Sequence, residues 1–234
     1  MDFSPTKTTF EELIKRYDYT FVDAGALNGD ISGDIHLAKQ HSADGVRNSQ
    51  RALEIHKESI AFFLDMVDRG YNFYLTERVK GEIRVAGGEI VLESTKRGQR
   101  NLRGFGGEYY GKRRRLSRLT DRLIRELERR QTVVGPGSFT KPEVELYKTL
   151  YSQCGYLRDK HNLSYTDFDL LIMGAVFSDQ RGSTAVVSND RGIFDATMEY
   201  IGTTQTDLSL FCPYRRWGPN FFKNFVGDGK SNAF

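Results

Sequence analysis

Four acidic residues occupy positions at which a parallel sheet collects its ligands. Asp23 and Asp190 each follow a short apolar run typical of a buried strand, Asp167 opens an apolar helical pattern, and Glu82 lies in a helix expected after another strand. Because ligands bind at the carboxyl ends of parallel strands, these side chains are expected to share one crevice. Carboxylate oxygens are the ligands that Mg²⁺ and Mn²⁺ prefer, so the set predicts a divalent-metal site.

The chemistry expected of such a site is phosphodiester hydrolysis. Two divalent ions about 3.5–4 Å apart activate a water and stabilise the leaving oxygen. The sequence leaves two positions of the predicted ligand set undecided. Glu77 precedes Glu82 in the same segment and is an alternative ligand. Asp169, two residues after Asp167, points away from it on a regular helix, and either reaches a second metal ion or only favours the helix amino terminus.

Each acid also has a structural explanation. Asp167 lies three residues after Ser164, as in a capping box, and Asp190 is placed to cap the helix that follows it. Glu82 alone is typical of a solvated helix residue. Asp23 is harder to explain structurally, because Asp is depleted in strands. The shared position of all four acids at strand ends and helix starts favours the metal site.

The order of elements predicts the fold class. Strands are expected at 19–22, 71–75, 185–187 and 207–211, a loop at 28–47, and helices at 10–17, 48–69, 76–83, 116–127, 142–161, 167–176 and 190–200. Strands alternating with helices predict an α/β fold, a three-layer α/β/α arrangement around a mainly parallel sheet. We expect a single domain over residues 1–234, with a basic insertion at 85–139 and an aromatic tail at 213–234.

Composition favours a globular protein of the cytoplasm. The chain has 234 residues, 38% of them hydrophobic, and no apolar run near the roughly 18 residues of a membrane span. The amino terminus has no basic region followed by an apolar one, so no secretory signal is expected. Cys154 and Cys212 have no ligand spacing and are expected to be buried free thiols in a reducing compartment.

Positive charge is concentrated in the insertion. From Lys96 to Gln131 there are thirteen Lys and Arg against four acids, a net charge of +9, which leaves −6 for the rest of the chain. A glycine-rich loop is expected first, then an arginine-rich amphipathic helix carrying Leu116 to Leu127. The candidate contacts to nucleic acid are Lys96, Arg97, Arg100, Arg103, Tyr109, Tyr110, Lys112, Arg113, Arg114 and Arg115. Two alternatives remain: a solvated helix face, or a surface for an acidic protein partner.

The acidic motifs resemble those of the PIN-domain ribonucleases. Phe21-Val22-Asp23 is similar to that family's first strand, Glu82 to its helical Glu, Leu163-Ser164-Tyr165-Thr166-Asp167 to its LSxxD helix start, and Val187-Ser188-Asn189-Asp190 to its TND strand end. The resemblance implies a PIN-like fold and an Mg²⁺- or Mn²⁺-dependent endoribonuclease, with those four acids as catalytic ligands. It also implies that Ser188 and Asn189 line the site and that Asp169 corresponds to an extra acid of some members.

The resemblance has departures, and other functions remain open. Ser188 replaces the usual Thr, and the segments 24–70 and 85–139 are longer than in compact members, so their substrates are not carried over. One alternative is a nucleic-acid-binding scaffold with an inactive site, and another is a DNA flap-type nuclease. An inhibitory or scaffold protein and a homodimer are further partners to consider. The aromatic tail is expected to pack on the domain or a second subunit rather than to stack on bases.

Overall fold

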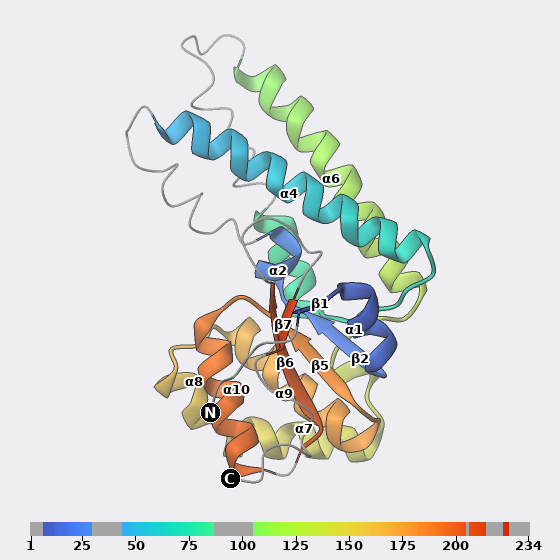
Figure 1. Ribbon diagram of the computed structural model, residues 1–234, viewed down its shortest axis with the longest axis vertical. Helices are drawn as coiled ribbons and strands as arrows, with labels where there is room; N and C mark the ends of the chain where they lie inside the picture. Colours follow the sequence, from blue (N-terminus) through green and yellow to red (C-terminus); the bar gives the residue numbers. More distant parts are fainter. Residues whose placement is uncertain (1–6, 30–43, 87–104, 205, 214–221, 225–234) are drawn as a thin grey trace.

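A five-stranded sheet lies at the centre of the structure, a computed structural model that describes residues 7–29, 44–86, 105–204, 206–213 and 222–224 (Figure 1). The strand order is β1-β7-β6-β5-β2. β2, β5 and β6 are parallel, whereas β7 is antiparallel to β6 and β1 is antiparallel to β7. The strand bounds are β1 Lys7–Thr8, β2 Tyr19–Val22, β5 Thr184–Val187, β6 Leu208–Pro213 and β7 Phe222–Asn224.

A second parallel pair, β3 (Leu75–Thr76) and β4 (Val133–Val134), extends this sheet beyond β2. Tyr74 forms a parallel bridge with Phe21, and its carbonyl accepts a hydrogen bond of 3.0 Å from the Val22 N–H. β3 therefore runs beside β2 in the same direction. The carboxyl ends of β2, β3 and β5 consequently lie at one edge of the sheet.

Helices connect the strands and cover the sheet. Their bounds are α1 Phe10–Arg16, α2 Ala24–Asn28, α4 Asp44–Asp68, a helix over residues 77–86, α6 Phe105–Arg129, α7 Lys141–Gln153, α8 Gly155–Lys160, α9 Tyr165–Gln180 and α10 Arg191–Thr203, with a 3-10 turn, η2, at Pro136–Ser138. No helix within these described ranges is long and apolar enough to cross a membrane.

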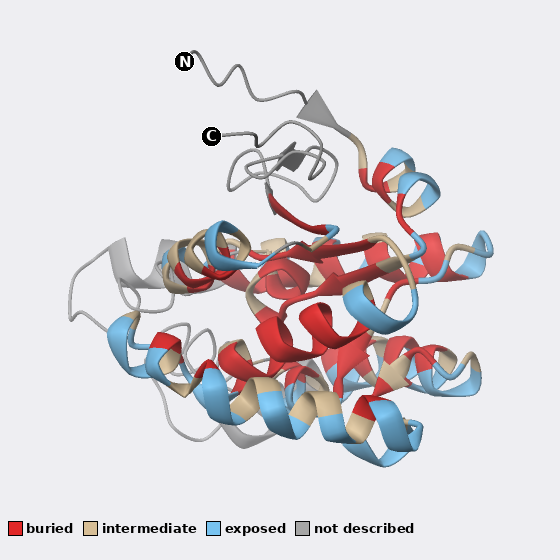
Figure 2. Cartoon of the chain, turned by 90° about the horizontal axis from the view of Figure 1, so that it is seen from below, coloured by how far each residue is buried: buried red, intermediate tan, exposed pale blue. Residues whose placement is uncertain are grey.

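Alternate strand residues face two hydrophobic clusters. Val22 and Val187 point into a cluster with α1, α4 and α6, whereas Phe21 and Val186 point into one with α7, α9 and α10. This alternation follows from the two-residue period of a strand. Helices therefore pack on both faces of the sheet, and buried residues line the strands and the inner sides of the helices (Figure 2). The arrangement is compatible with the predicted three-layer α/β/α fold.

Helix α9 is the central helix of one layer. Every residue from Phe168 to Phe177 is buried, including Asp169, as expected for a helix apolar on all sides. Gly174 allows the close approach of this helix to the sheet, because a Cβ there would lie 2.9 Å from Val186 Cγ2 and 3.2 Å from Leu208 Cδ1. The amino terminus of α9 thereby lies at the same edge as the carboxyl ends of the strands.

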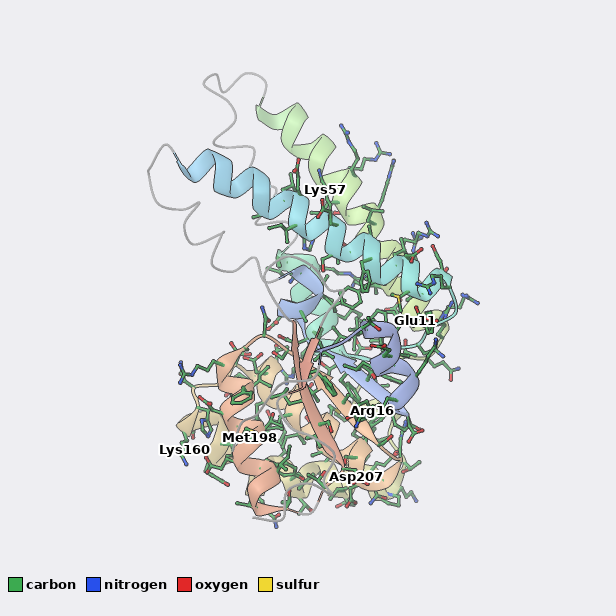
Figure 3. The ribbon with its side chains drawn as sticks, viewed as in Figure 1. Glu11, Arg16, Lys57, Lys160, Met198 and Asp207 are labelled. Atoms are coloured by element: carbon green, nitrogen blue, oxygen red, sulfur yellow. The ribbon has the colours of Figure 1, made fainter. Side chains whose placement is uncertain are left out.

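Helices α4 and α6 run side by side and project from the sheet as a helical arm (Figure 1). Ile60, Phe63 and Val67 of α4 are buried in one cluster with Leu123 and Leu127 of α6. Glu11 of α1 lies beside the carboxyl end of α4 (Figure 3). Its carboxylate holds that end in place by accepting hydrogen bonds from Arg69 at 2.7 Å and from the Tyr71 hydroxyl. Helix α2 lies between the sheet and the arm.

Several sequence predictions are wrong in their bounds. The strand expected at 71–75 is limited to Leu75–Thr76 and the bridge at Tyr74. The helix expected at 142–161 is interrupted at Cys154, which separates α7 from α8. The glycine-rich loop of the insertion is helical from Phe105 onward, and residues 87–104 lie outside the described part. The loop expected at 28–47 gives way to α4 at Asp44.

Other elements are additional to the prediction. Helix α2, the two-residue strand β4 and the antiparallel strands β1 and β7 were not expected from the sequence. β7 pairs with β6, so residues 222–224 of the aromatic tail form a strand of the sheet. Cys154 is a buried free thiol, as predicted, whereas the side chain of Cys212 lies outside the described part.

We predict that Gly174→Ala destabilises the protein by about 1–3 kcal/mol, because the added methyl group overpacks the contact with Val186 and Leu208. Gly202→Ala is the matched control: a Cβ at this α10 position meets nothing within 4 Å. The control is expected to be neutral or stabilising by about 0.5–1 kcal/mol. Urea unfolding of the variants measures both effects, and equal stability of the two would contradict the close approach of α9.

Candidate functional site

Asp23 lies where β2 ends at the sheet edge. Its N–H continues the strand ladder to the Val187 carbonyl at 2.9 Å. Its carboxylate caps α2 by accepting from the Gly25 N–H at 3.2 Å, and also accepts from the Ser188 hydroxyl at 3.0 Å. The residue is 4% exposed. Asp23 is thus a buried carboxylate fixed by two adjacent strands.

Burial and neighbouring charge both oppose ionisation of Asp23. Burial is the largest cause that raises its pKa, from 3.8 to about 7, and the negative charges of Asp167 and Glu82 add to it. The hydrogen bond from Ser188 acts in the opposite direction. A carboxylate that titrates near neutrality beside two other acids is typical of functional sites.

Glu82 comes from the helix that follows β3. The Thr76 hydroxyl caps that helix by accepting from the Val79 N–H at 3.2 Å. Burial raises the pKa of Glu82, the charge of Asp167 raises it further, and a hydrogen bond with Thr166 lowers it. Glu77, by contrast, is more than half exposed and pairs with Lys80. The electrostatic effects therefore group Glu82, rather than Glu77, with Asp23 and Asp167.

Asp167 takes part in a capping box and in the acidic cluster at once. Its carboxylate accepts from the Ser164 N–H at 3.1 Å, and its own N–H donates to the Ser164 hydroxyl at 3.1 Å. The structural explanation for this residue is therefore correct. The capping hydrogen bonds leave the negative charge of the Asp167 carboxylate in place, and this charge raises the pKa of both Asp23 and Glu82.

Asp190 reaches the site through Ser188 rather than through its own carboxylate. The exposed carboxylate accepts from the Ile193 N–H at 3.1 Å and caps α10, as the structural explanation predicts. Its backbone N–H donates to the Ser188 hydroxyl at 3.1 Å, and that hydroxyl donates to Asp23. Asp190 is not among the charges that chiefly shift the pKa of Asp23.

Asn189 lies beside the amino end of α2. A Cβ on Gly25 would overlap the Asn189 Oδ1 atom and would lie 3.1 Å from Asp23 Oδ2. The absence of a side chain at Gly25 thus leaves room for the Asn189 amide next to Asp23. Ser188 and Asn189 both border the acidic cluster, the position the resemblance implied for them.

Asp169 belongs to a different network. The Tyr147 hydroxyl donates to its Oδ1 at 2.7 Å, and Arg78 Nε lies 3.9 Å from its Oδ2. Burial raises the pKa of Asp169, while the bonds from Tyr147 and Thr76 and the charge of Arg78 lower it. Asp169 therefore has partners of its own, and the acidic cluster consists of Asp23, Glu82 and Asp167.

The basic candidates are described only in part. Arg114 and Arg115 are exposed on α6. Tyr109, Tyr110, Lys112 and Arg113 lie within α6, but their side chains are outside the described part of the structure, as are Lys96, Arg97, Arg100 and Arg103 altogether. The prediction that these residues bind nucleic acid stays a prediction.

Sequence reasoning missed three residues around the acidic cluster. Thr166 bonds to Glu82, and Arg78 lies between Asp169 and Tyr165. Arg78 precedes Glu82 by four residues, which places both on one helix face, and this spacing was the available signal. Thr166 and Tyr165 stand inside the LSxxD-like motif, where only the acid and the cap had been considered.

The donor chemistry of the cluster suits a hard divalent cation. Asp23, Glu82 and Asp167 offer only oxygen atoms, and the repulsion among them is relieved by a cation. Among the residues that the structure describes, no three His, Cys, Asp or Glu side chains form a ready-made metal-binding group. The carboxylates fit such an ion by chemistry and charge, and Ser188 already orients one of them.

No protein-family model, curated protein or solved structure matches the chain.

We predict that the contribution of Asp23 to the free energy of unfolding decreases as the pH rises from about 4 to about 7. The pKa of Asp23 is higher in the folded protein than in the unfolded chain, so the folded state binds the proton more tightly and loses on the order of 4 kcal/mol over this interval. Asp23→Asn is expected to abolish this part of the pH dependence and to be more stable than the wild type at pH 8.

Urea unfolding at several pH values measures the effect, and the difference between wild type and variant isolates Asp23 from other titrating groups. Asp190→Asn is the matched control, because its carboxylate is exposed and Asn is an equally good helix cap. Parallel pH profiles for the wild type and Asp23→Asn would show that Asp23 is not a destabilised carboxylate.

Proposed function

We propose that this chain is a PIN-like endoribonuclease that depends on Mg²⁺ or Mn²⁺. One observation carries the proposal: Asp23, Glu82 and Asp167 come from three separate segments at the carboxyl edge of a parallel sheet, where the charges of Asp167 and Glu82 raise the pKa of Asp23 and the charge of Asp167 raises that of Glu82. A buried carboxylate such as Asp23 is costly without a compensating charge, and a divalent cation is the partner that such an oxygen-donor set favours.

Each residue of the site has a role in the proposal. Asp23, Glu82 and Asp167 would hold the metal, which when bound supplies an activated water and charge stabilisation for phosphodiester hydrolysis. Ser188 fixes the orientation of the Asp23 carboxylate through its 3.0 Å hydrogen bond, and Thr166 does the same for Glu82. Asn189 offers a polar amide beside Asp23. Asp190 positions Ser188 through its backbone N–H.

The helical arm supports RNA as the substrate. The helical repeat places Arg114, Arg118 and Arg125 on one face of α6, and all three are exposed. The described part of the chain contains no acidic partner for Arg114 or Arg118. Arg122 and Arg129, in contrast, pair with Asp68 and Glu126 at 2.8 Å. Exposed guanidiniums on a projecting helix are suited to the phosphates that flank the cleaved bond.

A nucleic-acid-binding scaffold with an inactive site is the second candidate. It is favoured by the engagement of Asp167 in its capping box and of Asp190 in capping α10, which leaves fewer carboxylate oxygens free for a metal. The two candidates differ in a single property, the hydrolysis of bound RNA.

We predict that Asp23→Asn lowers the rate of Mn²⁺-dependent RNA cleavage by at least about 100-fold, because the residue holds the metal and not the RNA backbone. Binding of the same RNA is expected to persist. Gel analysis of end-labelled single-stranded RNA measures cleavage, and a filter assay measures binding.

Glu77→Gln is the matched control for that experiment, since Glu77 lies close in the chain, pairs with Lys80 and is outside the cluster. It should cleave like the wild type. Cleavage that survives Asp23→Asn contradicts the assignment of the site. RNA binding by the wild type without cleavage under Mg²⁺ or Mn²⁺ would favour the scaffold.

We predict that the double variant Arg114→Gln/Arg118→Gln weakens RNA binding and lowers the slope of log affinity against log salt by about 1–2, as expected for the loss of two phosphate contacts. Arg129→Gln is the control, because its charge is already compensated by Glu126. Titrations at several salt concentrations measure the slopes. An unchanged slope for the double variant would exclude this face of α6 as the RNA-binding surface.

A further inference from the structure

Tyr165 is an exposed aromatic residue at the edge of the acidic cluster. It is the first residue of α9, two positions before Asp167, and 59% of its surface is accessible. Most large hydrophobic side chains described here are buried, and Tyr165 is one of three that are exposed, with Val85 and Tyr156. An exposed ring beside a candidate active site points to a ligand rather than to packing.

Two guanidinium groups flank the Tyr165 ring. Arg158 Cζ lies 4.7 Å from the ring centroid and Arg78 Cζ lies 5.9 Å from it. Both arginines have acidic neighbours, but neither is enclosed: Arg78 lies 3.9 Å from Asp169 and is 51% exposed, and Arg158 pairs with Asp159 at the surface. The cluster of Tyr165, Arg78 and Arg158 therefore combines a flat apolar surface with positive charge.

This cluster adjoins the acidic site through two shared elements. Arg78 precedes Glu82 by one helical turn on the helix over residues 77–86, which puts both on the same face. Tyr165 precedes Thr166, which bonds to Glu82. Tyr165 is thus two residues from Asp167 along α9 and next to the residue that bonds to Glu82.

We propose that Tyr165, Arg78 and Arg158 form a nucleotide subsite that holds one unpaired base and an adjoining phosphate of single-stranded RNA next to the cleaved bond. The subsite rests on the proposed function, since it names the substrate class of that same site. A base stacks on the Tyr165 ring, and Arg78 binds the phosphate. Bases in a duplex are already stacked on one another, so this subsite favours unpaired RNA.

A base that stacks on Tyr165 replaces a guanidinium on one face of the ring, and the relative strengths of the two contacts favour this exchange. An exposed cation–π contact is worth a factor of about 2–5 in equilibrium, whereas the stacking of a base on an aromatic ring is worth a factor of about 5–150. A base can therefore displace a guanidinium from one face of the ring with a net gain. The displaced guanidinium remains close enough to bind a phosphate.

The test measures RNA binding without cleavage. The whole chain carrying Asp23→Asn is titrated in EDTA with a fluorescein-labelled single-stranded oligoadenylate, and anisotropy gives the dissociation constant. Adding Tyr165→Ala is expected to weaken binding at least about 5-fold, and Tyr165→Phe to retain it within about 2-fold. Arg78→Gln should lower the salt slope by about 1.

Tyr156→Ala is the matched control, because Tyr156 is also exposed, at 49%, and no guanidinium of the described residues lies over its ring. Melting temperatures verify that each variant is folded. Equal affinities for Tyr165→Ala and Tyr156→Ala would overturn the subsite. Competition by oligoglutamate as strong as that by unlabelled oligoadenylate would overturn it too, since charge alone would then explain binding.

Failure of the subsite and failure of the nuclease proposal give different results. Binding that depends on Tyr165, with a wild type that cleaves no RNA under Mg²⁺ or Mn²⁺, supports the subsite and contradicts the nuclease. Metal-dependent cleavage whose KM is unaffected by Tyr165→Ala contradicts the subsite and leaves the nuclease in place.

Discussion

Repulsion between the buried carboxylate of Asp23 and the partly buried carboxylates of Glu82 and Asp167 is the constraint around which this site is built. Asp23 cannot ionise near neutral pH without the free-energy cost of burial and of two neighbouring negative charges. A fold that needed only a helix cap at this position would be served by Ser or Asn, which cap α2 without any charge. The presence of acids at all three positions is the basis of the proposed cation site. Local hydrogen bonds from Ser188 and Thr166 reduce the repulsion only in part.

The parallel sheet brings residues that are far apart in the sequence to one edge, at the carboxyl ends of its strands. Beyond the last paired residues of β2 and β5, the Asp23 N–H bonds to the Val187 carbonyl and the Ser188 N–H bonds to the Phe211 carbonyl, so the ladder continues into the site. The side chains at these positions are thus held by the backbone rather than by mobile loops. The tight packing of α9 on β5 through Gly174 places the amino end of α9, and with it Asp167, at the same edge.

The sequence identified the parts of the site that depend on local pattern. Strand ends and helix starts follow from short-range periodicity and capping, so Asp23, Asp167 and the helix carrying Glu82 were predicted. The choice between Glu82 and Glu77 depended on which helix face meets α9, which only packing determines. Two other acids also have partners that only the structure identifies. The Asp190 carboxylate caps its own helix, α10, and the Asp169 carboxylate accepts a hydrogen bond from Tyr147. Helix α2 and the early start of α6 were missed because Gly25, Gly106 and Gly107 disfavour helix locally. For α2, the Asp23 cap and the packing against α4 override that preference.

The most direct test of this account is a carboxyl ¹³C NMR titration of Asp23 with and without Mg²⁺, assigned through Asp23→Asn. The account predicts that Asp23 titrates near pH 7 in the metal-free protein and well below its ordinary pKa of 3.8 when Mg²⁺ is saturating. Titration near the ordinary value in the metal-free protein, with no response to Mg²⁺, would contradict the central claim that this edge of the sheet is a cation-binding acidic site.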